Sequence, residues 1–473
     1  MLFNSYEFLI LLAVTLPLYH LRGSRTWQVA VLLAASSVFY AWENPKLLFL
    51  LGFSCAFNAL AVERIIFWKN QGQEKREKRW LTCSVALNLA FLGFFKYGGL
   101  LLGVKSIPLP IGISFYTFHA ISLLVDVHRR KVSEETVRRL GRQGRDRISS
   151  FSDLTLYIIF FPQLVAGPIV KAHQFIDQIR TKLWNDIPWV VVRRYLVTGY
   201  FLKIFVADNL CEQTAMLTLP TNVLATSSPV HLMALLYGYG LQIFADFAGY
   251  SLIAIGLGLM FGYRLPENFR FPYLAASITE FWRRWHLSLS SWLRDYLYIP
   301  LGGNRKGPAR TYINLFLVMF LGGLWHGAEW KFALWGTLHG VLLAVERFIA
   351  RRHGEEAPAP KHRVTKLLMW IYTFHAVMFL WLTFLMPDLH HIAAFFQGLT
   401  SGNWSVPGQS VYALVFYGTA IVLYHLWGWI LENRQTLANR LVTPWTEGAL
   451  QGLMLFLILT NPGAPRGFIY FQF

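Results

Sequence analysis

The chain carries little charge for its length. Only 14% of its 473 residues are Asp, Glu, Lys or Arg, whereas 55% are hydrophobic and 16% aromatic; a globular protein has about a quarter charged residues. Apolar segments recur from Phe8 to Leu459 with short polar connections, which leaves no room for a sizeable soluble domain. The composition predicts an all-α polytopic membrane protein whose residues 1–473 form a single transmembrane domain.

Cysteine is scarce, and several common motifs are missing. The three cysteines, Cys55, Cys83 and Cys211, have no paired spacing, so neither a disulfide framework nor a zinc site is expected, and we predict no metal. No P-loop occurs, and the glycines of GLGLMFG (256–262) are explained by close helix packing in lipid. The first segment lacks a basic n-region and a small-residue cleavage site, so we expect a retained first span.

Hydrophobic runs of about 20 residues, the length that crosses a bilayer core, are the main feature that is present. The candidate spans are 5–22, 26–42, 45–68, 80–103, 107–128, 195–209, 230–262, 311–327, 330–349, 366–386, 410–431 and 447–461. Segment 154–170 contains Pro162 and a Gly-Pro pair and has basic residues on both sides. We expect it to be re-entrant, because irregular backbone at membrane depth must be buried in protein or line a cavity.

The distribution of Lys and Arg predicts the orientation. The net charge is +18, yet the basic residues fall in short loops between apolar runs, as the positive-inside rule expects, so nucleic acid is a poor candidate partner. Residues 387–433 contain no Lys or Arg. We expect the loop 387–409 and both termini to face outward, and place in the cytosol the segments 63–80, 128–147, 264–310 and 351–363.

The most unusual stretch is ITEFWRRWHLSLSSWLRDYLYIPLGGNRKGPAR (278–310). Two stripes at helical spacing run through it. The aromatic stripe is Trp285, Leu289, Trp292 and Tyr296, and the polar stripe is Arg284, Ser288, Ser291 and Asp295. The pattern predicts a helix along the cytosolic interface, with its polar face toward water; an anchor without further function remains the alternative.

A single histidine, His326, ends the uncharged apolar run that follows this stretch. An ionisable group in an apolar run is energetically unfavourable, so it is expected to have a structural partner or a functional role. The basic loop before it suits an anionic, phosphate-bearing cytosolic donor, since Arg and Lys pair well with phosphate oxygens. A coenzyme A thioester is such a donor, and a neutral imidazole is the general base that hydroxyl attack on a thioester needs.

These residues resemble a known family. The stretches LPIGISFYTFHAISLLVDVHR, FFPQLVAGPI, ITEFWRRWHLSLSSWLRDYLYIPLGGNR, LGGLWHGA and FIYFQF are similar to the membrane-bound O-acyltransferase (MBOAT) superfamily, in its bacterial alginate O-acetyltransferase branch. The resemblance runs in order along nearly the whole chain.

The resemblance implies a bundle of about 11 spans, with re-entrant and interfacial helices, around a funnel. It implies an enzyme of the bacterial inner membrane that takes acetyl from cytosolic acetyl-CoA for O-acetylation of a periplasmic polysaccharide such as alginate. A periplasmic SGNH-type acetyltransferase is the implied partner. The signature histidine maps onto His326, and a partly shared Asn-or-His position maps onto His286.

Two positions depart from the pattern of the alginate branch. Leu252 follows Gly-Tyr-Ser where a carboxylate is expected, and His119 also replaces an expected carboxylate. These departures leave the reaction unchanged but weaken the assignment of the glycan, so peptidoglycan and cellulose remain alternatives.

Each candidate side chain also has a purely structural interpretation. His286 could be catalytic or could only anchor its helix, and Asp246 is favoured as a structural partner of a tyrosine or arginine. The positive-inside rule alone explains the candidate donor-binding residues Arg283, Arg284, Arg305, Lys306 and Arg310. His339, His390 and His391 are given no role.

A non-enzymatic carrier of a small anion is the alternative from another class of protein. A carrier also needs buried ionisable residues and broken helices. Its charges should spread over several spans, whereas here the motifs concentrate in 278–310 and LWHG, and we detect no internal repeat.

Overall fold

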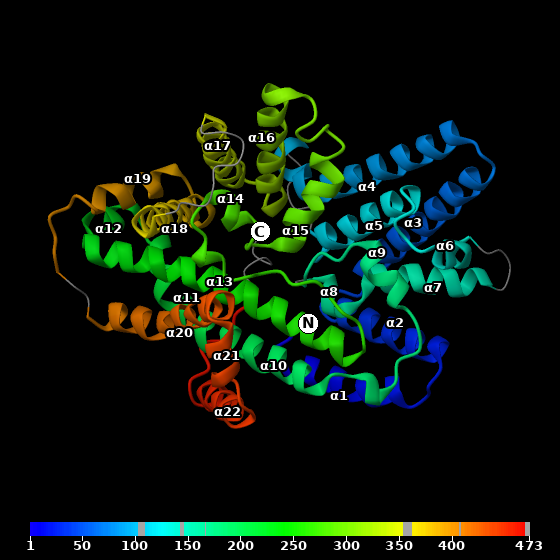
Figure 1. Cartoon of the computed structure of the whole chain (residues 1–473), viewed down its shortest axis with the longest axis horizontal. Helices are drawn as coiled ribbons and strands as arrows, with labels where there is room; N and C mark the ends of the chain where they lie inside the picture. Colours follow the sequence, from blue (N-terminus) through cyan, green and yellow to red (C-terminus); the bar gives the residue numbers. More distant parts are fainter. Residues whose placement is uncertain (103–108, 142–145, 166, 353–361, 406–407, 469–473) are drawn as a thin grey trace. The chain divides into compact units, whose positions relative to one another are not determined.

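Within the described residues, all regular structure is helical, as predicted. The computed structural model describes residues 1–473 except 103–108, 142–145, 166, 353–361, 406–407 and 469–473 (Figure 1). The last residues of FIYFQF and most of the loop 351–363 therefore lie outside the described residues, and the side assigned to the C-terminus stays a prediction.

The chain divides into two compact units, which we describe separately. Unit 1 comprises Met1–Leu196 and Ser251–Pro266, and unit 2 comprises Val197–Tyr250 and Glu267–Phe473. Two of the three boundaries in the chain fall inside helices, at Leu196 in α10 (Trp189–Tyr200) and at Tyr250 in α13 (Pro229–Met260), and the third follows Pro266. The single domain expected over residues 1–473 stays a prediction.

Unit 1 is built around helices that pack as consecutive neighbours. Its helices are α1 (Tyr6–His20), α2 (Arg25–Ala41), α3 (Leu47–Asn70), α4 (Glu74–Leu102), α5 (Ile113–His128), α6 (Glu134–Leu140), α7 (Asp146–Ile159), α8 (Phe161–Leu164), α9 (Ala172–Phe175), the first part of α10 and the end of α13. Helix α3 contacts both α4 and α5. Asn58 on α3 and Asn88 on α4 exchange side-chain hydrogen bonds of 3.1 and 2.9 Å, which satisfies both buried amides without water.

The predicted re-entrant segment 154–170 is irregular. Helix α7 ends at Ile159, the short α8 carries Pro162, and residues 167–171 are not helical. The Tyr157 hydroxyl donates to the Val170 carbonyl oxygen at 2.8 Å. Buried side chains therefore satisfy this backbone, as the re-entrant interpretation requires.

Unit 2 holds the remaining helices. They are the end of α10, the π-helical segment η3 (Phe201–Ala207), α11 (Asp208–Thr214), α12 (Thr221–Thr226), most of α13, α14 (Ile278–Trp282), α15 (Leu287–Leu293), the π-helical segment η6 (Arg294–Tyr298), α16 (Gly307–His326), α17 (Trp330–Arg352), α18 (Arg363–Leu385), α19 (Leu389–Gly398), α20 (Gly408–Asn433), α21 (Gln435–Leu441) and α22 (Pro444–Thr460). Helices α16 and α17 lie side by side, and α18 packs against α17 (Figure 1).

The predicted count of about eleven spans is not confirmed. Among the described residues, six helices are long and apolar enough to cross a membrane, or up to seven if the bent pair α21 and α22 forms one span. The six are Leu47–Asn70, Glu74–Gly99, Pro229–Met260, Trp330–Arg352, Arg363–Leu385 and Ser410–Asn433. Other candidate spans correspond to shorter helices; segment 5–22, for example, contains the 15-residue α1.

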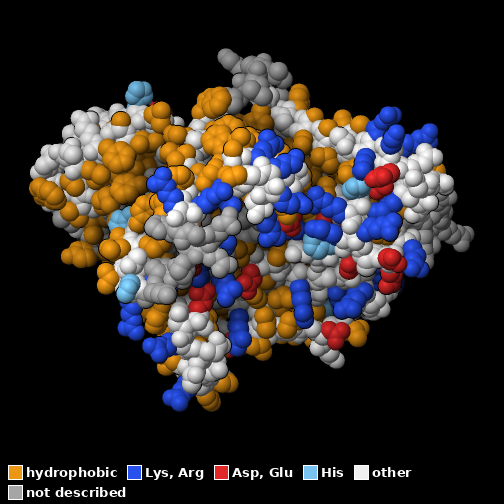
Figure 2. All heavy atoms as spheres, turned by 45° about the horizontal axis from the view of Figure 1, so that its top comes forward, with side chains coloured by type: hydrophobic (Ala, Val, Ile, Leu, Met, Phe, Trp, Pro, Cys, Tyr) orange, Lys and Arg blue, Asp and Glu red, His pale blue; other side chains and the backbone are white. Residues whose placement is uncertain are grey.

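Large hydrophobic side chains are exposed on the surface, as expected where lipid is the solvent. Figure 2 shows hydrophobic side chains over much of one face, with Lys and Arg gathered in patches among them. Phe49, Tyr412 and Trp445 are 82%, 76% and 89% exposed. A soluble monomer rarely exposes so many such residues together.

Candidate active site

The hairpin of α16 and α17 positions His326. Helix α16 ends at His326, Gly327 continues in extended backbone, and α17 begins at Trp330. A Cβ on Gly323 would lie 2.2 Å from the Phe332 carbonyl oxygen, and a Cβ on Gly336 would lie 2.2 Å from that of Met319. Glycine at these positions lets the two helix backbones approach closely.

Aromatic rings from three helices surround the His326 imidazole, which is 4% exposed. The centroid of its ring lies 5.0 Å from Trp325 on α16, 5.2 Å from Trp335 on α17 and 5.3 Å from Phe384 on α18. The rings meet edge to face, an arrangement that fixes the imidazole by packing. His326 is therefore held rigidly in a site that largely excludes water.

His286 lies at a break between two helices and not within one helix. Helix α14 ends at Trp282 and α15 begins at Leu287, with His286 in left-handed backbone at φ 45°. The prediction of one uninterrupted interfacial helix in the stretch 278–310 is therefore wrong. The left-handed conformation is unfavourable for a residue with a Cβ and is often found where structure serves function.

Asn268 orients the His286 ring. The Asn268 Oδ1 atom lies 3.0 Å from His286 Nδ1 and also accepts hydrogen bonds from the Ser288 backbone N–H and hydroxyl. Because this oxygen accepts, Nδ1 carries the proton and Nε2 is the basic nitrogen. His286 is fully buried, and this burial lowers its pKa to about 3, so the ring is neutral at physiological pH.

Trp325 links the two histidines that the sequence singled out. The ring centroid of His286 lies 6.0 Å from that of Trp325, the residue before His326. On another side, the Phe247 ring lies 4.6 Å from His286 in a T-shaped contact. The structure thus brings His286 and His326 to one aromatic cluster, and their catalytic roles remain predictions.

The predicted basic residues differ in their availability. Arg284 forms ion pairs with Glu280 at 2.9 Å and Glu432 at 2.8 Å, so carboxylates already engage its guanidinium. Arg305 and Lys306 are exposed in the turn that precedes α16. Arg283 is also exposed. Of these residues, Arg284 has the clearest structural role.

The polar stripe is not a solvated face. Ser288 and Asp295 are only 3% and 8% exposed, and Asp295 accepts a hydrogen bond from Arg294 Nε at 2.9 Å. The expectation that this stripe faces water is therefore wrong. The aromatic residues Trp285 and Trp292 are buried, as predicted.

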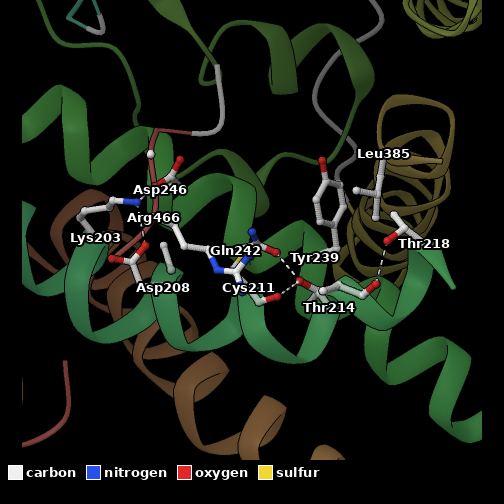
Figure 3. A pocket seen from close by; sticks show the side chains of 13 residues that line it. Lys203, Asp208, Cys211, Thr214, Thr218, Tyr239, Gln242, Asp246, Leu385 and Arg466 are labelled. Carbon is white, nitrogen blue, oxygen red and sulfur yellow. Dashed lines mark hydrogen bonds and ion pairs between the residues drawn. The ribbon is translucent and has the colours of Figure 1, made fainter. Parts of the chain in front are cut away.

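Asp246 belongs to a buried ionic triad, shown in Figure 3. Lys203 Nζ lies 2.7 Å from Asp246 Oδ1 and 2.7 Å from Asp208 Oδ1. Lys203 is thus a partner of Asp246, in addition to the tyrosine or arginine that we considered. Sequence reasoning overlooked Lys203, although a lone lysine within the apolar segment 195–209 was a detectable signal.

The triad stands at a local irregularity of the backbone. Lys203 lies in η3, and a Cβ on Gly249 of α13 would lie 2.9 Å from the Lys203 backbone nitrogen. π-helical turns are frequent at functional sites. A cavity of about 260 Å³ adjoins the triad. Within the described part of the chain, no group of three or more His, Cys, Asp and Glu residues could hold a metal ion.

Comparison with known proteins identifies the class. The model of the membrane-bound O-acyltransferase family matches residues 80–387, a range that includes both candidate histidines. The chain belongs to this family, and is therefore a multi-pass membrane acyltransferase and not a carrier.

Named relatives are similar over most of the chain. The probable alginate O-acetylase AlgI of Pseudomonas putida is 34% identical, covering 100% of both chains. That of Pseudomonas aeruginosa is 37% identical over 98% of this chain and 88% of its own. The peptidoglycan O-acetyltransferase of Helicobacter pylori is 35% identical over 79% of this chain and 73% of its own.

Proposed function

We propose that this chain takes an acetyl group from cytosolic acetyl-CoA and delivers it across the membrane for O-acetylation of alginate or an alginate-like polysaccharide. The observation that carries the proposal is the similarity to alginate O-acetylases over the full chain. We further propose a single domain of about 11 spans in the bacterial inner membrane, with a periplasmic SGNH-type acetyltransferase as partner.

The residues have defined roles in this proposal. His326 accepts the proton of a hydroxyl group on the acceptor, and the oxygen of that hydroxyl attacks the acetyl carbonyl carbon. A C–O ester bond forms, the C–S bond breaks, and the departing CoA sulfur takes up the proton, so that CoA leaves as a thiol. His286 assists His326 from the same aromatic cluster. Arg283, Arg305 and Lys306 bind the phosphates of the donor. Arg284 could bind them only if its ion pairs with Glu280 and Glu432 were broken.

Release of free CoA from acetyl-CoA tests the reaction. Purified protein in detergent would be incubated with acetyl-CoA labelled in its acetyl group, and both free CoA and the labelled product would be measured. We expect turnover above that of an equal amount of His326→Ala protein. Turnover that is the same in both preparations would contradict the proposal.

Peptidoglycan is the second candidate acceptor, and the Helicobacter pylori relative favours it. Disruption of the gene separates the two acceptors. We expect alkali-labile acetate to disappear from the secreted polysaccharide and to persist on purified muropeptides. The reverse result would assign peptidoglycan.

A further inference from the structure

A cavity in unit 2 is lined by charged, polar and apolar side chains. Its volume is about 260 Å³. The residues that line it, drawn in Figure 3, are Lys203, Ala207, Asp208, Cys211, Thr214, Ala215, Thr218, Tyr239, Gln242, Asp246, Leu385, Arg466 and Gly467. Arg466 and Thr218 are exposed, whereas the triad is buried, so the cavity has an open side and a closed, charged side.

One wall of the cavity carries a hydroxyl suited to a ligand. Tyr239 is 2% exposed. Its hydroxyl has no hydrogen-bond partner among the residues that the structure describes. A buried hydroxyl without a partner is unfavourable, and a bound molecule with polar groups would satisfy it.

The cavity is lined by charged groups of both signs. The triad of Lys203, Asp208 and Asp246 combines one ammonium group with two carboxyl groups, and Arg466, which also lines the cavity, lies near them in Figure 3. Carboxylate oxygens have spare lone pairs that can accept hydrogen bonds from ligand hydroxyls. A guanidinium binds a carboxylate through two parallel hydrogen bonds. The lining therefore suits a small ligand that carries both hydroxyl groups and a carboxylate.

The C-terminal segment brings Arg466 to this position. After α22, the Asn461 carbonyl oxygen accepts a hydrogen bond from the Asn209 side chain at 3.1 Å, and the Ala464 N–H donates to Glu212 at 3.1 Å. A Cβ on Gly463 would lie 2.6 Å from the Asn209 backbone nitrogen. Arg466 is thus part of a segment that is held against α11.

Adjacent residues face the cavity and the histidines. Asp246 lines the cavity, while the ring of the next residue, Phe247, contacts His286. Likewise Leu385 lines the cavity, while the ring of Phe384 contacts His326. Helices α13 and α18 therefore each contribute neighbouring residues to the cavity and to the histidine cluster.

The size of the cavity limits its occupant. The volume of about 260 Å³ is many times the space that one ordered water molecule needs. We therefore consider a single sugar ring as the occupant. The predicted orientation puts Asp208 and Leu385 at the outward ends of their segments, the side where an extracellular glycan would arrive.

We propose that this cavity binds one hexuronate unit of the acceptor glycan, with its carboxylate on Arg466 and its hydroxyls toward Tyr239 and the aspartates of the triad. The inference rests on the proposed function, because it takes the acceptor to be a polyuronate. According to this inference, the chain itself contacts the sugar, and a periplasmic partner supplies the rest of the acceptor-binding site.

Saturation-transfer NMR on the full chain in detergent would measure binding, with D-mannuronate as the probe and D-mannose as the uncharged comparison. We expect signal transfer to mannuronate that a tenfold excess of mannose does not displace. Arg466→Gln and Tyr239→Phe should each reduce this transfer at least fivefold. The matched exposed controls, Arg440→Gln and Tyr412→Phe, should leave it unchanged.

The natural cysteine Cys211 in the lining locates the site. In a Cys83→Ser background, where the remaining Cys55 is buried, mannuronate should slow maleimide labelling of Cys211. Absence of mannuronate binding, equal binding of mannose, or binding that survives both cavity variants would overturn the inference. If mannuronate bound but no CoA were released from acetyl-CoA, only the proposed function would be contradicted. If CoA were released but mannuronate did not bind, only this inference would be contradicted.

Discussion

At the scale of single residues, His326 carries the sharpest prediction. His326→Ala removes the proposed base and leaves a small cavity among aromatic rings. General base catalysis contributes about 10²–10⁴-fold, so CoA release should fall by about that factor while the protein still inserts and purifies. His286→Ala should impair less, and the exposed His390→Ala should have no effect. Near wild-type transfer in the His326 variant would return this residue to a structural role.

Substitution of Arg305 and Lys306 tests how the donor, acetyl-CoA, is bound. Replacing both residues by Glu should raise the KM for acetyl-CoA more than it lowers kcat. The reason is that residues that bind phosphates far from the reacting atoms stabilise the ground state and the transition state equally. Steady-state kinetics over a range of acetyl-CoA concentrations would measure both constants. Raising the ionic strength should weaken the difference between variant and wild type, since exposed charges are screened. A fall in kcat at unchanged KM would contradict this role.

At the scale of elements, the close approach of α16 and α17 should control the site. Gly323→Ala puts a methyl group 2.2 Å from the Phe332 carbonyl oxygen, so the helices must separate. Overpacking of this kind costs about 1–3 kcal/mol, and the separation would also shift His326 at the end of α16. We expect a lower midpoint of thermal unfolding in detergent and reduced CoA release.

Gly52→Ala on α3 is the matched control for this glycine. No atom lies within 4 Å of a Cβ added there, so alanine should be neutral or stabilise the helix by up to about 1 kcal/mol. If Gly323→Ala behaved like Gly52→Ala in both measurements, the close approach of the helices would not be needed for the site.

Helices were easier to predict from the sequence than their interruptions. Hydrophobic runs such as 330–349 and 410–431 lie within α17 and α20, because the length of an apolar run directly reflects the bilayer. The break at His286 was not foreseen, since the helical spacing of Trp285 and Leu289 continues through it. Its left-handed backbone accompanies hydrogen bonds that the Asn268 side-chain oxygen accepts from His286 and Ser288, and such tertiary contacts leave no local pattern.

The same distinction applies to the candidate site. The histidines were found because an ionisable group in an apolar run is rare. The box of Trp325, Trp335 and Phe384 around His326 comes from three helices, and no periodicity within one helix can predict such a meeting. The lone Lys203 was a detectable signal, but its pairing with the distant Asp246 is a tertiary contact that no local pattern predicts.

At the scale of the whole molecule, the predicted orientation can be tested by labelling. Single cysteines would be introduced into a variant lacking Cys55, Cys83 and Cys211, at exposed positions in 128–147 and 387–409. A membrane-impermeant maleimide added to intact spheroplasts should label only the 387–409 loop, because the Lys and Arg asymmetry places 128–147 in the cytosol. Labelling of the 128–147 arm before lysis would reverse the orientation.

The last prediction is that the chain hands acetyl to a periplasmic partner. Acetyl-CoA is cytosolic, and the exposed Arg305 and Lys306 belong to the segment predicted on that side. A mature polysaccharide lies beyond a bilayer core of about 30 Å. The predicted outward loop, 387–409, is too short to bury a core of its own, so a second protein should complete the outer acceptor site. The test is reconstitution in vesicles with acetyl-CoA on the basic side. We expect slow hydrolysis by the chain alone, and faster, outward acetyl delivery when the partner is added. If this chain alone acetylated an external glycan at full rate, no partner would be needed, and the acetyl group would be transferred directly across the membrane.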